Sequence, residues 1–128
     1  MTLLPRLAAA TASSAVLLTG CVANPPAGDP SAATGTISVI STDTTCEVSP
    51  ATATSGTVRF RITNSGSQTT EFYLLAADGL RVVAEKENLA TGATAELSVS
   101  LQPGTYATAC KPGMRGEKVG QATFTVTG

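Results

Sequence analysis

Apolar and polar residues alternate along segment after segment of this chain from Thr36 onward, and this pattern constrains the fold most strongly. In segment 57–63, Val58, Phe60 and Ile62 alternate with threonine and arginine. Successive side chains of a strand point to opposite faces, so the alternation predicts strands with one buried face. Further strands are predicted at 37–39, 71–74, 80–85, 94–101, 106–110 and 122–126.

Turn-forming residues separate these segments, and no window has a convincing helical period. The turns are predicted at Ser55-Gly56, Asn64-Ser-Gly66, Asp78-Gly79, Thr91-Gly92, Pro103-Gly104 and Pro112-Gly113. Short strands at this spacing favour an all-β sandwich of two sheets. Leu101-Gln-Pro-Gly-Thr-Tyr106 is similar to the tyrosine corner of such folds, which gives Tyr106 a structural role.

The first 20 residues have the composition of a bacterial export signal. Arg6 precedes an apolar run, 7–18, that is too short to span a bilayer and ends in Leu17-Leu-Thr-Gly-Cys21. This ending resembles a lipobox, with cleavage after Gly20 and acylation of Cys21; the alternative is a plain cleavage site beside an ordinary cysteine. We expect a lipoprotein held on the extracytoplasmic face of a bacterial cell membrane.

The predicted organisation is a signal at 1–20, an acylated cysteine with a proline-rich tether at 21–35, and one domain at 36–128. Arg6 is the only charged residue of the signal, so 8 Lys/Arg and 9 Asp/Glu become 7 and 9, a net charge of −2. This balance argues against a nucleic-acid partner, which requires clustered cations. We expect a monomer.

Two cysteines, Cys46 and Cys110, remain once Cys21 is acylated. Outside the cytoplasm such a pair usually forms a disulfide. As thiolates, the two residues would instead be soft metal ligands. Both alternatives require the two sulfur atoms to lie close together.

A loop near the C-terminus has the form of a copper-protein ligand loop. In Cys110-Lys-Pro-Gly-Met114, a cysteine leaves a predicted strand, a Pro-Gly turn follows, and a methionine comes just beyond. The chain contains no histidine, whereas a blue-copper centre needs two imidazoles beside the thiolate. The composition therefore excludes a blue-copper electron carrier.

Residues 36–127 resemble cupredoxin-like domains, specifically the amino-terminal domain of EfeO-type bacterial iron-uptake proteins. The matching pieces occur in order along the domain: Cys46-Glu-Val-Ser-Pro50, Gly56-Thr-Val-Arg-Phe60, Thr63-Asn-Ser-Gly66, Thr70-Glu-Phe-Tyr73, Val83-Ala-Glu-Lys-Glu-Asn-Leu89, Leu101-Gln-Pro-Gly104 and Tyr106-Ala-Thr-Ala-Cys-Lys-Pro-Gly-Met114. The resemblance implies a cupredoxin-like Greek-key β-sandwich of about seven to eight strands. It also implies a role in binding or delivering iron or copper.

The resemblance further implies a set of metal ligands, namely Cys46, Glu71, Cys110, Met114, Glu85 and Glu87. Glu71 stands where ordinary cupredoxins have a histidine. The implied partners are an iron-uptake permease, a peroxidase or an imelysin-like protein. EfeO proteins usually continue into an imelysin-like domain, whereas this sequence ends at Gly128, which favours an accessory module.

The residues themselves leave alternatives open. Glu85 and Glu87 are two apart and share a strand face, where they either bind a cation or form a solvated edge with Lys86. Met114 is a soft ligand, a partner contact, or a loop residue with neither role. Ferric iron would favour the carboxylates, and cuprous copper would favour sulfur.

Three functional classes follow. The first is a lipid-anchored metal-binding or metal-delivery module, and the second is a disulfide-stabilised interaction module that docks another uptake component. The third, an enzyme or electron carrier, is disfavoured because no base–nucleophile arrangement with histidine can be assembled.

Overall fold

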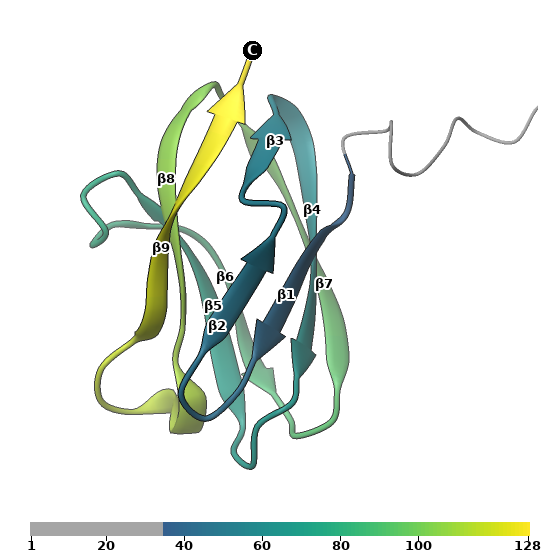
Figure 1. Ribbon diagram of the computed structural model, residues 1–128, viewed down its shortest axis with the longest axis vertical. Helices are drawn as coiled ribbons and strands as arrows, with labels where there is room; N and C mark the ends of the chain where they lie inside the picture. Colours follow the sequence, from purple (N-terminus) through teal and green to yellow (C-terminus); the bar gives the residue numbers. More distant parts are fainter. Residues whose placement is uncertain (1–34) are drawn as a thin grey trace, which may run out of the picture.

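The computed structural model describes residues 35–128, which form two packed β-sheets (Figure 1). Nine strands occur in this part of the chain: β1 (Ile37–Ser41), β2 (Cys46–Ser49), β3 (Thr52–Thr54), β4 (Gly56–Asn64), β5 (Thr70–Ala76), β6 (Val82–Leu89), β7 (Thr94–Leu101), β8 (Gly104–Cys110) and β9 (Val119–Thr127). A single 3₁₀ turn, η1 (Pro112–Met114), follows β8 within the same described residues. The expected all-β sandwich is confirmed.

The strands are ordered β2-β1-β4-β7 in one sheet, called sheet A here, and β3-β9-β8-β5-β6 in the other, called sheet B. β1 runs parallel to β4, and β3 runs parallel to β9, whereas the other pairs are antiparallel. The chain crosses from sheet A to sheet B between β2 and β3, between β4 and β5, and between β7 and β8. Such crossings are those of a Greek-key sandwich.

Three phenylalanines form the centre of the core between the sheets. Phe60 of β4 is fully buried and lies 5.2 Å from Phe72 of β5 and 5.3 Å from Phe124 of β9, measured between ring centroids. The rings are tilted by 45° and 53°, within the arrangements that aromatic pairs prefer. The alternating apolar residues of the sequence thus meet face to face across the two sheets.

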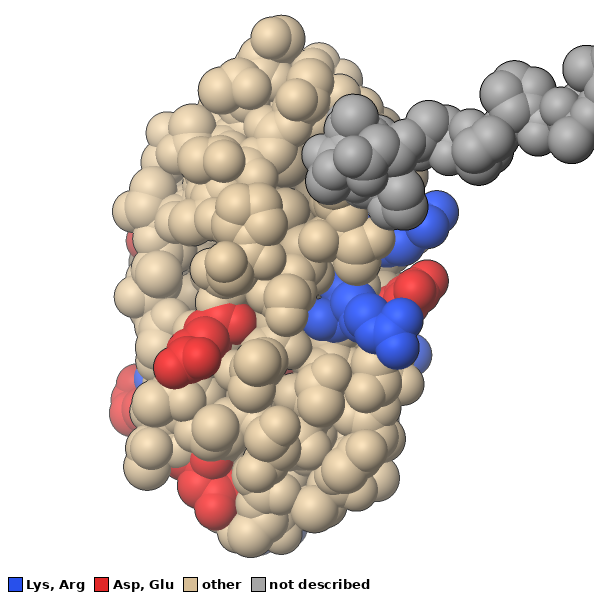
Figure 2. All heavy atoms as spheres, turned by 45° about the vertical axis from the view of Figure 1, so that its right-hand side comes forward, with Lys and Arg blue, Asp and Glu red and all other residues tan. Residues whose placement is uncertain are grey.

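The outer face of sheet A carries few charges. Arg59 and Arg61 of β4 are exposed, and Arg61 is directly opposite Glu96 of β7. Figure 2 shows a mostly uncharged surface on this side, with one group of basic side chains beside an acidic one. The buried carboxylate of Glu71 lies on sheet B.

Two details differ from the sequence-based prediction. The strand count is nine in residues 35–128, because β2 and β3 are only four and three residues long and too short to show a period. The alternation in segment 80–85 predicts Leu80 on the buried face of a strand, but Leu80 lies in the turn before β6 and is 77% exposed. Asp78 accepts hydrogen bonds from the backbone N–H groups of Leu80 and Arg81, and these bonds hold the turn.

The predicted tyrosine corner is present. The Tyr106 hydroxyl donates a hydrogen bond of 2.8 Å to the carbonyl oxygen of Gln102. No helix within residues 35–128 is long and apolar enough to cross a membrane. The predicted signal, the acylation of Cys21 and the tether lie outside the described residues, apart from the last residue of the tether.

Candidate metal-binding site beside the ligand loop

Four connections meet at the end of the sandwich where β1, β4 and β8 finish. Backbone hydrogen bonds join them: Ser65 N–H donates to Ser41 C=O, Gly92 N–H to Asn64 C=O, and Gly113 N–H to Thr69 C=O. The Cys110–Met114 loop is therefore supported by the connection between β4 and β5. The conformation of the Cys110–Met114 loop therefore depends on the neighbouring connection as well as on its own residues.

Asn64 fixes this end from inside. Its side chain is 1% exposed; its Nδ2 donates to the carbonyl oxygens of Gln68 and Leu89, at 2.7 and 2.8 Å. Its Oδ1 accepts a hydrogen bond from Gly66 N–H at 2.9 Å. One buried amide thus ties the turn before β5 to the end of β6, which positions the residues that follow on β5.

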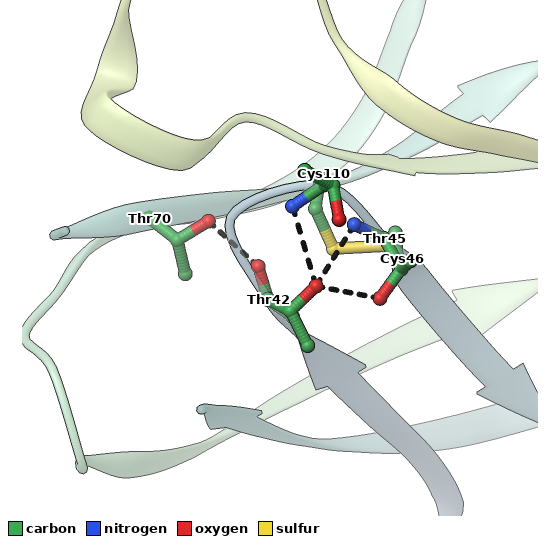
Figure 3. The surroundings of a disulfide bond; sticks show 7 residues. Thr42, Thr45, Cys46, Thr70 and Cys110 are labelled. Carbon is green, nitrogen blue, oxygen red and sulfur yellow. Dashed lines mark hydrogen bonds between the residues drawn. A yellow bond between two sulfur atoms is a disulfide. The ribbon is translucent and has the colours of Figure 1, made fainter. Parts of the chain in front are cut away.

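Cys46 and Cys110 form a disulfide that joins the two sheets (Figure 3). Cys46 begins β2 in sheet A, Cys110 ends β8 in sheet B, and their Cα atoms are 5.4 Å apart. Cys110 is fully buried and Cys46 is 7% exposed. Of the two alternatives left by the sequence, the structure has the disulfide, in which neither sulfur is a thiolate.

The turn before Cys46 is held by threonines. The Thr42 Oγ1 accepts a hydrogen bond of 2.9 Å from Thr45 N–H and lies 2.6 Å from the Thr45 hydroxyl (Figure 3). On the other side, Gly120 of β9 packs so closely that an added Cβ would be 2.6 Å from the backbone nitrogen of Cys46. The disulfide therefore lies in a tightly packed environment.

Glu71 and Tyr73 lie two residues apart on β5 and share the face of sheet B that points away from the core. The Tyr73 hydroxyl donates a hydrogen bond to the Glu71 carboxylate. Both side chains are almost fully buried, with 6% of Glu71 and 8% of Tyr73 exposed. A nearly buried carboxylate is costly unless it has a hydrogen-bond partner, and the phenol of Tyr73 provides one.

Glu85 and Glu87 of the neighbouring strand extend this negative region. Glu85 is directly opposite Tyr73 in the β5–β6 pairing. Burial raises the pKa of Tyr73 well above its usual value, with further contributions from the hydrogen bond to Glu71 and from the charges of Glu71, Glu85 and Glu87. All three carboxylates therefore act on one phenol.

Two lysines complete the surroundings. Glu71 and Lys111 exchange backbone hydrogen bonds, which makes Lys111 the residue opposite Glu71. The Lys118 ammonium group lies 5.3 Å from the centre of the Tyr73 ring, within the range of a cation–π contact. No local sequence pattern indicates Tyr73, Lys111 or Lys118 as neighbours of Glu71, because their proximity depends on strand pairing and on the return of the loop.

The structure separates the predicted ligands into two sets. Phe72 pairs with Cys110, and both point into the core, whereas Glu71, the residue before Phe72 on β5, points outward. The cysteines and Glu71 therefore lie on opposite faces of sheet B. Met114 ends η1 with φ of 58° and is half-buried in the loop.

Histidine, cysteine, aspartate and glutamate alone do not assemble a metal site here: within residues 35–128 no group of three or more of them could hold a metal ion. The donors gathered on the outer face of sheet B are oxygens, from Glu71, Tyr73, Glu85 and Glu87. Oxygen donors suit hard cations. This donor chemistry fits ferric iron better than cuprous copper.

Two sheets in this strand order, closed by a cysteine that precedes a Pro-Gly-Met loop, define the cupredoxin class of sandwich. The family model of the cupredoxin-like domain matches residues 9–126, and the chain belongs to this family. The fold is similar to that of reduced auracyanin from Roseiflexus castenholzii, with a TM-score of 0.56 and 17% identity over 73% of this chain and 97% of auracyanin.

The resemblance to EfeO is also confirmed. The chain is 35% identical over 74 residues to the iron uptake system component EfeO of Escherichia coli K12, and equally to that of Shigella flexneri. The matched region covers 58% of this chain and 19% of EfeO, so the chain corresponds to about a fifth of those relatives.

Proposed function

We propose that this chain is a membrane-anchored extracytoplasmic lipoprotein whose cupredoxin-like domain binds or delivers iron or copper in an EfeO-type metal-uptake system. The observation that carries the proposal is the nearly buried Glu71 carboxylate, which lies among further acidic side chains beside the ligand loop. The similarity to EfeO, whose name places it in iron uptake, supports the same role. The chain would act by binding rather than by catalysis.

The charge of the site supports a cation as its ligand. Three carboxylates act on Tyr73, and two lysines lie beside them, so the group has an excess of negative charge. A bound cation would relieve the repulsion among the carboxylates. The exposed Glu85 and Glu87 would form the entrance to the site.

Titration of the purified full chain in detergent with ferric citrate, cupric ion and cuprous ion tests the proposal. We expect binding at micromolar concentration that weakens at least about tenfold in Glu71→Gln, because the amide removes a charged ligand with little change in shape. Glu96→Gln is the matched control, since Glu96 is exposed on sheet A. Absence of binding of every ion under oxidising and reducing conditions would overturn the proposal.

The second candidate is a non-metal interaction module, favoured by the inter-sheet disulfide, which keeps both sulfur atoms out of metal coordination. This module would dock a permease, a peroxidase or an imelysin-like protein of the same system. Failure of metal binding together with co-purification of such a component would support it.

Membrane fractionation of Cys21→Ala tests the anchor separately: we expect release of the chain from the membrane.

A further inference from the structure

We propose that the outer face of sheet A rests on the headgroups of anionic phospholipids, and that Arg59 and Arg61 are the residues that contact them. The inference rests on the membrane anchor of the proposed function, to which it adds a second contact and an orientation of the domain. It does not depend on metal binding, because both arginines lie on the other sheet from Glu71.

The two arginines stand together on one face. They are two residues apart on β4, where exposed residues alternate with buried apolar ones. They are the only cationic residues on the four strands of sheet A, all of which lie within the described part of the chain. Ser98 of β7 is opposite Arg59, and Ser38 of β1 is level with its neighbour on the face. Long basic side chains among such small ones can reach a flat surface that meets the sheet.

Two carboxylates share this face, but they do not balance the charge near Arg59. Glu96 of β7 is opposite Arg61 and diagonal to Arg59. Glu47 of β2 is level, across β1, with Thr63, which is four residues further along β4 than Arg59. At about 3.3 Å per residue, Glu47 is thus at least about 13 Å from the level of Arg59. The end of the face around Arg59 has an excess of positive charge.

The chain enters the domain beside the same arginine. β1 and β4 run parallel with Ile37 level with Phe60, so Thr36 is level with Arg59 (Figure 1). Fourteen residues, 22–35, separate Cys21 from this point, and a chain of that length reaches about 50 Å at most. An acylated Cys21 would therefore hold this end of sheet A near the bilayer at a high effective concentration, at which weak contacts are enough for docking.

The charges on the other side of the sandwich favour the same orientation. The outer face of sheet B carries the carboxylates of Glu71 and Glu85. An anionic bilayer repels these carboxylates and attracts Arg59 and Arg61. Docking through sheet A turns the candidate site toward the aqueous phase, where its ligand can reach it.

Guanidinium groups suit phospholipid headgroups because they form paired hydrogen bonds with phosphate oxygens. A basic residue near an anionic membrane raises the ratio of docked to undocked protein about fivefold, so two arginines raise it about 25-fold. Salt shortens the range of this attraction, from about 10 Å at 0.1 M ionic strength to about 3 Å at 1 M. The docked state should therefore depend on both lipid charge and salt.

The test places one fluorescent reporter on each face of the full-length lipoprotein, whose native sequence contains no tryptophan. Ser98→Trp puts the reporter beside Arg59, and Thr123→Trp puts it on the exposed outer face of sheet B. Each protein is reconstituted into vesicles of phosphatidylcholine, or of equal parts phosphatidylcholine and phosphatidylglycerol, that contain a lipid with a dansyl-labelled headgroup. Energy transfer from tryptophan to dansyl then reports which face lies on the membrane.

We expect phosphatidylglycerol to increase energy transfer from Ser98→Trp and to leave transfer from Thr123→Trp low. Molar salt should remove the increase. Addition of Arg59→Gln and Arg61→Gln to Ser98→Trp should lower the ratio of docked to undocked protein at least about tenfold. Arg81→Gln is the matched control, because Arg81 is an exposed arginine in the turn before β6, and it should leave this ratio unchanged.

Circular dichroism of each variant confirms that it is folded, and the comparisons of lipid and salt require no change at the arginines. Equal transfer from the two reporters in anionic vesicles would overturn the inference and leave the membrane anchor intact. Transfer from Ser98→Trp that is the same with and without phosphatidylglycerol would do so too. Failure of the lipoprotein to enter either kind of vesicle would overturn the anchor of the proposed function, and this inference with it.

Discussion

Cys110 and Glu71 lie on adjacent strands of sheet B but face opposite sides of it: the cysteine points into the core, and the carboxylate points outward beside Tyr73. This relationship divides the ligands implied by the sequence resemblance. The sulfur atoms of Cys46 and Cys110 bond across the two sheets, and the Glu71 carboxylate lies apart from them on the outer face of sheet B.

Loss of the disulfide should lower the free energy of unfolding. It should leave Glu71 and Tyr73 in place on the outer face of sheet B. The bond closes a sequence separation of 64 residues, and the chain-entropy relation assigns it about 4 kcal/mol of the free energy of unfolding. Urea unfolding of the Cys46→Ser/Cys110→Ser double variant should show this loss. A thiol assay on the wild-type chain, denatured but not reduced, is the companion measurement. Two free thiols from Cys46 and Cys110 would contradict the disulfide.

Gly120→Ala should destabilise the fold by about 1–3 kcal/mol, because the added methyl group would overlap the backbone of Cys46. Gly120 also has φ of 64°, which disfavours alanine. Gly92→Ala is the matched control, since Gly92 has φ of 77° but nothing within 4 Å of an added Cβ. Equal effects of the two substitutions on urea unfolding would show that the contact with Cys46 is unimportant.

Asn64→Ala should cost about 3 kcal/mol of unfolding free energy, because it leaves the buried carbonyl of Leu89 and two further groups without their partner. Asn64→Asp retains the oxygen that accepts from Gly66 N–H but loses the Nδ2 donor. It therefore separates the contribution of the accepted hydrogen bond from that of the two donated ones. We expect Asn64→Ala also to weaken metal binding, since the amide positions the start of β5. Unchanged stability in urea would contradict this role.

Stability should depend on pH through Asp78 in acid. Hydrogen bonds from the backbone N–H groups of Leu80 and Arg81 hold the pKa of Asp78 below its usual value of 3.8. Because the folded-state pKa is lowered, this contribution is fully present above the unfolded-state pKa and is lost as pH falls through the folded-state pKa. Thermal unfolding below pH 3.8 should be less sensitive to pH in Asp78→Asn. An identical pH profile would show that the charge contributes nothing.

Much of the fold could be predicted from local patterns. The alternation in β4 and β7 follows from their one-sided burial, and the Tyr106 corner has a sequence signature because its hydrogen bond spans four residues. Leu80 was placed wrongly because its apolar character continues the alternation of β6, whereas the Asp78 turn keeps it in solvent. A strand of three residues, such as β3, has no measurable period.

Residue types and their spacing are enough to predict the class of sandwich, the absence of imidazole ligands, and the two alternatives for Cys46 and Cys110. They do not show that the cysteines bond across the sheets or that Glu71 meets Tyr73 on the other face of sheet B; the folded chain shows both. These contacts depend on strand register, because a shift of one residue turns a side chain to the opposite face. Proximity across strands and loops is a property of the packed sheets.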